Sequence, residues 1–271
     1  MSETYKHFLD TAQSLAVDAS KIILSLYQTN LQTKEKSDKS VVTEADLAAD
    51  SLIRKGLREA FPDHGILTEE EGIVNTSESE YVWIVDPLDG TKAYAKGIPG
   101  FCVMIGLLQS GQPFLGVMVD PLSGNIYTAI KGQGAHITSK DGQRTQLRVT
   151  ERDALAEMPL ILSRGFPPEK LAELKNKVPA PTLEPINSAG IKVGFVARAE
   201  ADIYISHHPV SYWDTCAAEI ILEEAGGRYT TIDGQPLTYD LQPPFSLGKL
   251  TLATNGKQHD AWVEVLKGIF G

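Results

Sequence analysis

The feature that most constrains the fold is an apolar run at residues 81–85 that ends on a carboxylate. The run reads Tyr-Val-Trp-Ile-Val with no alternating polar positions, which is typical of a strand covered by other layers on both faces. Asp86 follows directly, and Pro87 fixes its own backbone angle and removes a hydrogen-bond donor. The turn that continues to Asp89 can direct two carboxylates and the Leu88 carbonyl toward one point. The sequence therefore predicts a layered protein with acidic oxygen atoms gathered at the end of a buried strand.

The first half of the chain combines two expected helices with a series of strands. Apolar residues recur at three- and four-residue steps from Phe8 to Leu26, and a second helix follows Thr43, which has the spacing of a capping box with Asp46. Strands are expected at residues 65–68, 81–85, 101–108, 114–119 and 125–130. The last strands are joined by short segments that contain Gly and Pro, and such connections favour an antiparallel meander.

The second half alternates helices with strands. Strands are expected at residues 160–163, 202–206 and 250–254, and helices at residues 168–176, 191–201, 213–225 and 259–266. This alternation favours a partly parallel α/β layer. We therefore expect two subdomains, an α+β unit over residues 1–152 and an α/β unit over residues 153–271.

Charge and composition limit the binding partners that this chain can have. Lys and Arg number 25 against 35 Asp and Glu, and a net charge of −10 gives no electrostatic basis for binding a nucleic acid polymer. No apolar run approaches the ~18 residues of a membrane span, and the polar residues after Met1 give no sign of a secretory leader. Cys102 and Cys216 are too few for a disulfide framework. We expect a soluble cytoplasmic protein with no membrane partner, present as a monomer or homodimer.

Several common catalytic motifs are absent from the sequence. There is no Gly-x-x-x-x-Gly-Lys-Ser/Thr loop and no Gly-x-Ser-x-Gly nucleophile elbow, and Gly132 and Gly134 lack the third glycine of a dinucleotide fingerprint. His207 and His208 form an isolated pair beside Pro209. Because zinc needs three or more protein ligands, this pair favours a loop over a zinc site. Carboxylates are the chemistry-bearing groups that remain.

Acidic residues recur at the ends of expected elements that lie far apart in the chain. Asp86 and Asp89 follow one strand, Glu69 and Glu70 follow another, and Asp46 and Asp214 lie at the starts of two helices. Each position has a plain alternative, which is an ordinary turn, a solvated acidic loop or a helix N-cap. A single assembled metal site accounts for all four positions at once. The expected helix start at Gly90-Thr91 favours an anion beside it, and hard oxygen ligands there suit Mg²⁺ bound to a substrate phosphate.

These residues resemble the two signatures of the inositol monophosphatase superfamily of Mg²⁺-dependent, lithium-sensitive phosphatases. The signatures are Asp-Pro-Leu-Asp-Gly-Thr at residues 86–91 and Trp213-Asp214 followed by Glu-Glu-Ala-Gly-Gly at residues 223–227. The spacing from Lys36 to Asp46 and the Thr-Glu-Glu element at residues 68–70 also match, so the similarity covers nearly the whole chain. It implies a five-layered αβαβα sandwich, with most metal ligands in residues 1–152 and with Asp214 and the specificity residues in residues 153–271.

The resemblance also implies roles for individual residues. One Mg²⁺ would be held by Glu69, Asp86 and the Leu88 carbonyl, a second by Asp86, Asp89 and Asp214, and a third, weaker ion with help from Asp46; Li⁺ would inhibit. Glu69 and Thr91 would orient the attacking water, Glu70 would support the metal ligands, and the N–H groups around Gly90 and Thr91 would hold the phosphate. Asp89, Lys36 and Ser188 would add substrate contacts. For a substrate with two phosphates, Lys192 or Arg164 could neutralise the second one as a charge-assisted donor, and surface solvation is the plain alternative for both. Transfer would go directly to water activated by Mg²⁺, without a nucleophilic side chain.

The branch that the chain most resembles is that of the 3′(2′),5′-bisphosphate nucleotidases, through Lys92, Ser163-Arg164 and residues 188–192. This implies hydrolysis of 3′-phosphoadenosine 5′-phosphate to AMP and phosphate. Two positions depart from the related patterns. His207 stands where inositol-selective members carry an acidic residue, and Phe166 stands where the nucleotidase branch frequently has histidine. Inositol monophosphate, histidinol phosphate and NADP stay open as substrates of the same chemistry, and a non-catalytic metal-binding module stays open as a different class.

Overall fold

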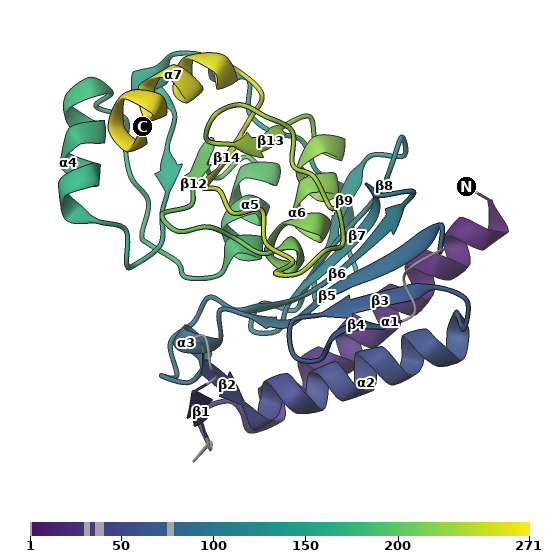
Figure 1. Cartoon of the computed structure of the whole chain (residues 1–271). Coiled ribbons are helices and arrows are strands. Elements are labelled where there is room, and N and C mark those ends of the chain that lie inside the picture. Colours follow the sequence, from purple (N-terminus) through teal and green to yellow (C-terminus); the bar gives the residue numbers. More distant parts are fainter. Residues whose placement is uncertain (1, 30–32, 36–40, 75–78) are drawn as a thin grey trace.

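Two β-sheets alternate with three layers of helices in the computed structural model, which describes residues 2–29, 33–35, 41–74 and 79–271 (Figure 1). The outermost layer holds α1 (Glu3–Leu26) and α2 (Glu44–Ala60), the middle layer holds α5 (Ala189–Ala197) and α6 (Tyr212–Glu224), and the third holds α4 (Pro168–Lys177) and α7 (His259–Phe270). An eight-stranded sheet separates the first two layers, and a four-stranded sheet separates the last two. The protein is the expected αβαβα sandwich.

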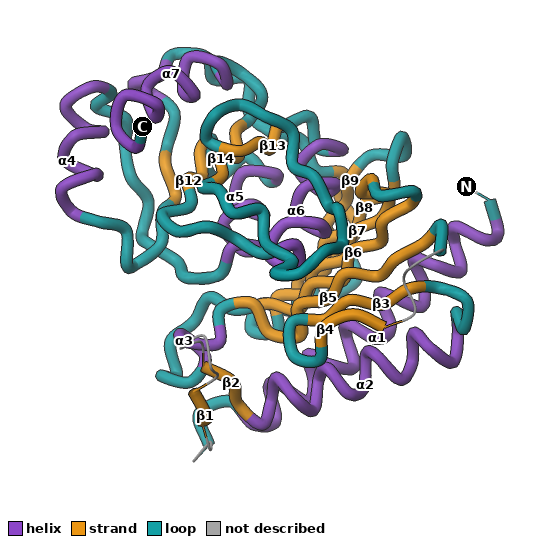
Figure 2. Tube along the Cα trace, in the orientation of Figure 1, coloured by secondary structure: helices purple, strands orange, loops and turns teal. Residues whose placement is uncertain are grey.

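The large sheet has the strand order β10-β9-β8-β7-β6-β5-β3-β4 (Figure 2). Its strands are β3 (Gly65–Thr68), β4 (Gly72–Val74), β5 (Tyr81–Asp89), β6 (Cys102–Gln109), β7 (Gln112–Asp120), β8 (Asn125–Ile130), β9 (Ala135–Thr138) and β10 (Arg144–Gln146). Only the β3–β5 pair is parallel, so the predicted meander from β5 onward is confirmed. β5 continues four residues beyond the expected run, because a register shift between Asp86 and Asp89 accommodates Pro87 in the pairing with β6.

The small sheet has the strand order β11-β12-β14-β13, with bounds of Leu160–Ile161, Ile203–Ile205, Thr251–Thr254 and Arg228–Thr231 in that order. β11 and β12 are parallel and the other pairs are antiparallel, so the predicted partly parallel layer is confirmed. β13 was not expected, because Arg-Tyr-Thr-Thr has no apolar run. The short elements β1 (Thr33–Glu35), β2 (Val41–Thr43), α3 (Thr91–Tyr94) and the 3₁₀ turn Leu155–Glu157 complete the chain.

The two halves of the chain share one core. Helix α6 comes from the second half but packs against β6 and β7 of the large sheet, and one cluster of buried side chains joins residues from both sides of the expected boundary at residue 152. The division into two subdomains therefore stays a prediction. None of the described helices is long and apolar enough to cross a membrane.

Two paired glycines let α6 approach the sheet closely. Gly106 of β6 and Gly116 of β7 are register partners directly beneath the helix. A Cβ atom on Gly106 would lie 2.6 Å from the Sγ of Cys216, and one on Gly116 would lie 2.5 Å from the carbonyl oxygen of Ala217. Because side chains are absent at both positions, the backbone of α6 rests directly on the strands.

Replacing Gly106→Ala should lower the free energy of unfolding by about 1–3 kcal/mol, the usual cost of overpacking a tight interior. The Cys216→Ala substitution removes the sulfur atom that the new methyl group would overlap, so the penalty of Gly106→Ala should be smaller in the Cys216→Ala background. Urea unfolding of the four proteins in this cycle measures the coupling. An equal penalty in both backgrounds would show that the contact between residue 106 and Cys216 does not determine how closely α6 packs on the sheet.

Candidate active site

Three aspartates converge where the large sheet meets α6. Asp86 and Asp89 come from the bulged end of β5, and Asp214 comes from the first turn of α6. One carboxylate oxygen from each lies within 4.8 Å of the other two. Asp86 and Asp89 are buried and Asp214 is partly buried. The register shift makes this possible, because without it the two β5 residues would follow the regular alternation of the strand.

Burial and mutual repulsion dominate the electrostatics of this cluster. The pKa of Asp86 lies well above its usual range, first because of burial and then because of the charges of Glu69, Asp89 and Asp214. Burial and Asp89 raise the pKa of Asp214 to about 7. A divalent cation among these oxygens would relieve the repulsion, and hard oxygen ligands are those that Mg²⁺ prefers. The cluster therefore fits a metal ion of this kind.

The N-terminus of α5 holds Asp89 in place. The carboxylate of Asp89 accepts hydrogen bonds from Ser188 Oγ at 2.5 Å, from the Gly190 N–H at 2.7 Å and from the Ala189 N–H at 3.2 Å. Ser188 is completely buried and is also the N-cap of α5. The structure thus places Ser188 against a carboxylate of the cluster, while its expected substrate contact stays a prediction.

Asp46 and Asp214 occupy equivalent places in two different helices. Each is the third residue of a helix and accepts a hydrogen bond from the backbone N–H of its N-cap, Thr43 at 2.9 Å and Ser211 at 2.7 Å. The predicted capping box at Thr43 is confirmed. Asp214 keeps an oxygen for the cluster, whereas the other oxygen of Asp46 lies 2.8 Å from Thr91 Oγ1. Asp46 is therefore beside Thr91 rather than in the three-aspartate group, and its expected part in a third ion stays a prediction.

Thr91 begins helix α3 directly after a left-handed glycine. Gly90 has φ of +98°, and a Cβ atom there would lie 2.7 Å from the carbonyl oxygen of Gly100, so glycine is required at this position. The hydroxyl of Thr91 lies 2.9 Å from the carbonyl oxygen of Leu88 as well as close to Asp46. These contacts fix the hydroxyl at the edge of the cluster.

A cavity of about 480 Å³ opens over the cluster. Among the expected residues, it is lined by Glu69, Asp86, Leu88, Asp89, Gly90, Thr91 and Asp214. Lys92, Ser163, Gly165, Asn187, His207, His208 and Trp213 also line it. The sequence analysis singled out Lys92, Ser163, His207, His208 and Trp213 from this second group, whereas no pattern in the sequence pointed to Asn187.

The remaining expected residues lie elsewhere. Lys192 is fully buried behind the wall, where its Nζ donates to Ser163 Oγ at 2.6 Å and to the Asn187 carbonyl at 3.2 Å, and burial lowers its pKa to about 8. Arg164 is exposed and pairs with Glu184 at 3.6 Å. Glu70 lies in the turn between β3 and β4, and Lys36 lies outside the described residues.

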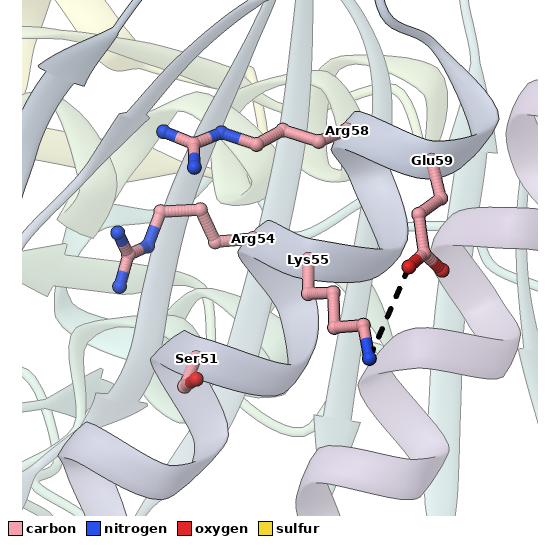
Figure 3. Close-up of a pocket in the computed structure, with 5 residues that line it drawn as sticks. All are labelled: Ser51, Arg54, Lys55, Arg58 and Glu59. Atoms are coloured by element: carbon pink, nitrogen blue, oxygen red, sulfur yellow. Dashed lines mark ion pairs between the residues drawn. The ribbon is translucent and has the colours of Figure 1, made fainter.

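A second hollow, of about 350 Å³, lies on the outer surface of α2 (Figure 3). Arg54 and Arg58 extend over the same side of the helix, and Lys55 pairs with Glu59 at 3.9 Å. Its lining residues all come from α2 and include no group of converging carboxylates, so we place the candidate active site in the cavity over the three aspartates.

The layered αβαβα fold and a buried acidic cluster that could hold a metal ion define the class of protein, and the comparisons identify the family. The model of the inositol monophosphatase family matches residues 4–265. The chain belongs to this family and is a phosphatase of the inositol monophosphatase superfamily.

Similar proteins carry several names. The chain is 33% identical over 241 residues to the 3′(2′),5′-bisphosphate nucleotidase CysQ of Escherichia coli strain K12, covering 88% of this chain and 96% of that protein. It is also 33% identical over 236 residues to the Nus factor SuhB of Pasteurella multocida, covering 83% and 85%. The solved inositol monophosphatase of Anabaena is 29% identical with a TM-score of 0.79, covering 98% of this chain and 97% of that one.

The raised pKa of Asp214 predicts how stability depends on pH without divalent cations. The folded protein keeps a proton on this carboxyl up to about pH 7, whereas the unfolded chain loses it near the ordinary value of 3.8. The folded state therefore binds more protons between these values, and stability should fall as the pH rises through this window. Thermal unfolding in a chelator, followed from about pH 5 to about pH 8, measures the slope.

Asp214→Asn is the matched variant, because it removes the titrating group and keeps an oxygen for the N-cap. Its melting temperature should fall less over the same range, and millimolar Mg²⁺ should raise it less than that of the parent protein at the upper end. Identical pH profiles for the two proteins would contradict the assignment of the repulsion to Asp214.

Proposed function

We propose that this protein is a Mg²⁺-dependent phosphomonoesterase that hydrolyses 3′-phosphoadenosine 5′-phosphate to AMP and phosphate. The observation that carries the proposal is the group of Asp86, Asp89 and Asp214 at the floor of a cavity that Glu69 and Thr91 also line. Bound Mg²⁺ ions would supply a water of lowered pKa and would neutralise charge on the phosphoryl oxygens. Two to three ions and inhibition by Li⁺ belong to the same proposal.

The chain itself would provide binding and orientation. Asp86, Asp89, Asp214 and Glu69 would supply carboxylates for the ions, and Leu88, whose carbonyl oxygen would be a further ligand, lines the same cavity. Thr91 is held between Asp46 and Leu88, so its hydroxyl has a fixed position from which it can orient a water molecule. The α5 N-terminus keeps Asp89 from rotating. Fixed positions of this kind lower the reorganisation that hydrolysis would otherwise need.

The nucleotide assignment is supported by a buried cation beside the cavity. Lys192 donates to Ser163 and to the Asn187 carbonyl, and both of these residues line the cavity wall. Its positive charge therefore acts on the cavity from behind the wall at low dielectric, where it favours a substrate with a second phosphate. Relatives named 3′(2′),5′-bisphosphate nucleotidase support the same reading. Inositol monophosphatase activity is the second candidate, supported by the structural similarity to solved inositol monophosphatases.

Asp214→Asn should leave a folded protein with phosphatase activity lower by at least about a hundredfold, because one shared carboxylate of the metal cluster is lost. Asp89→Asn should act in the same way. Phosphate release with saturating substrate and Mg²⁺ measures the effect. The matched control is Asp260→Asn, on a largely exposed residue that pairs with Arg228, and it should keep normal turnover. Near-normal activity of a folded Asp214→Asn protein would contradict the proposed site.

A side-by-side panel of substrates tests the specificity. The bisphosphate nucleotide should give the highest kcat/KM, above inositol 1-phosphate, histidinol phosphate and NADP. Lys192→Met, of similar length without charge, should reduce the preference for the bisphosphate over adenosine 3′-monophosphate by about tenfold, since the buried positive charge beside the cavity is lost. Lys249→Met is the control, because that lysine is exposed and pairs with Asp233. Higher kcat/KM on inositol 1-phosphate would replace the nucleotide assignment with the second candidate.

A further inference from the structure

The wall of the cavity has an aromatic part that the metal chemistry does not use. His207 and His208 lie in the loop between β12 and α6, and both line the cavity together with Gly165 and Trp213. The two imidazole rings are 4.6 Å apart in an edge-to-face arrangement. Planar rings thus occupy one part of the cavity, while carboxylates occupy its floor.

His207 is held by packing rather than by a hydrogen bond. Its ring lies 6.0 Å from the ring of Phe166, which is itself buried and packs edge-on against Phe270 of α7 at 6.3 Å. Its Nε2 would lie 3.4 Å from a Cβ atom on Gly165, an ordinary van der Waals distance, so the imidazole lies beside Gly165. Within the described part of the chain, His207 Nδ1 is buried and has no hydrogen-bond partner.

The surroundings keep this imidazole uncharged. Burial, and then the neighbouring His208 and Lys192, lower the pKa of His207 to about 4. The group that the loop presents to the cavity is therefore a neutral, flat, aromatic ring. A metal role does not fit, since the one group of potential ligands among the described residues is the three-aspartate cluster, which excludes both histidines.

The geometry points to His207 as a specificity-determining residue whose ring, supported by Phe166, stacks on the nucleobase of the substrate. This inference rests on the proposed nucleotidase function and deepens it. A base has a π-face that matches a planar ring, whereas a polyol or an amino alcohol does not. The cavity of about 480 Å³ lies within the size range of small-molecule sites, with one polar end for the phosphate and one aromatic part for the base.

Binding of AMP and of ribose 5-phosphate in the presence of Mg²⁺ tests the inference, because the two ligands differ only in the base and its attachment. Isothermal titration calorimetry should show that His207→Ala raises the Kd of AMP by about tenfold, the loss expected for one base–aromatic stack. The Kd of ribose 5-phosphate should change by less than about twofold, since no base is present to stack. His207→Phe, which keeps a planar ring, should bind AMP nearly as well as the parent protein.

His7→Ala is the matched control, because it removes an exposed imidazole of α1 that also packs against a phenylalanine ring, that of Phe61 at 5.1 Å, and that does not line the cavity. It should leave AMP binding close to normal. An unchanged Kd for AMP in His207→Ala, or equal weakening of both ligands, overturns the inference. So does a parent protein that binds AMP no better than ribose 5-phosphate.

The same proteins separate this inference from the proposed function. If the parent hydrolyses the bisphosphate nucleotide while His207→Ala binds AMP normally, the function stands and the role of His207 fails. If the parent prefers inositol 1-phosphate but shows base-dependent AMP binding that His207→Ala abolishes, the proposed substrate fails and His207 still contacts the base. Circular dichroism melting of each variant verifies that the compared proteins are folded.

Discussion

The repulsion between carboxylates that are forced together in a poorly hydrated place is the interaction on which the rest of the site depends. Asp86, Asp89 and Asp214 have oxygens within 4.8 Å of one another, and the two from β5 are buried. Such an arrangement is unfavourable without a counter-charge. The surrounding structure holds it with backbone N–H donors at Leu88, Ser211 and the start of α5. The cluster therefore has fixed geometry before any ligand binds, which is the condition for effective electrostatic stabilisation.

The arrangement of the layers brings Asp86, Asp89 and Asp214 together. A bulge in β5 changes the direction of two side chains, paired glycines let α6 lie close to the large sheet, and α5 begins against Asp89. The opposite wall of the cavity comes from loops that follow strands of the second sheet, at Ser163 and at His207. The carboxylates of the cluster come from β5 and α6, whereas Ser163 and His207 come from loops that follow β11 and β12, so different layers build these two parts of the cavity.

Much of this arrangement could be predicted from local patterns. An unbroken apolar run ending at Asp86, the capping spacing at Thr43, and acids at the ends of distant elements predicted the layers and the convergence. The contacts of Ser188 and the burial of Lys192 could not be predicted, because each depends on partners far away in the sequence and on the depth of packing. The bulge was missed for a related reason, since Pro87 indicated the end of a strand, whereas the pairing with β6 skips Pro87 and resumes at Asp89.

The two helix-capping aspartates have both a structural contact and a place near the cavity, and this affects how the protein can change during evolution. Asp46 and Asp214 each accept a hydrogen bond from the N-cap of a helix, and in addition Asp46 contacts Thr91 while Asp214 belongs to the cluster. Replacing such an aspartate by asparagine keeps an oxygen that can accept the N-cap hydrogen bond and removes the negative charge, whereas replacing it by alanine removes both. A gene copy released from selection for chemistry can thus accumulate asparagine at these places and retain its architecture. Loss of the catalytic charges in a descendant protein would therefore not require loss of the fold.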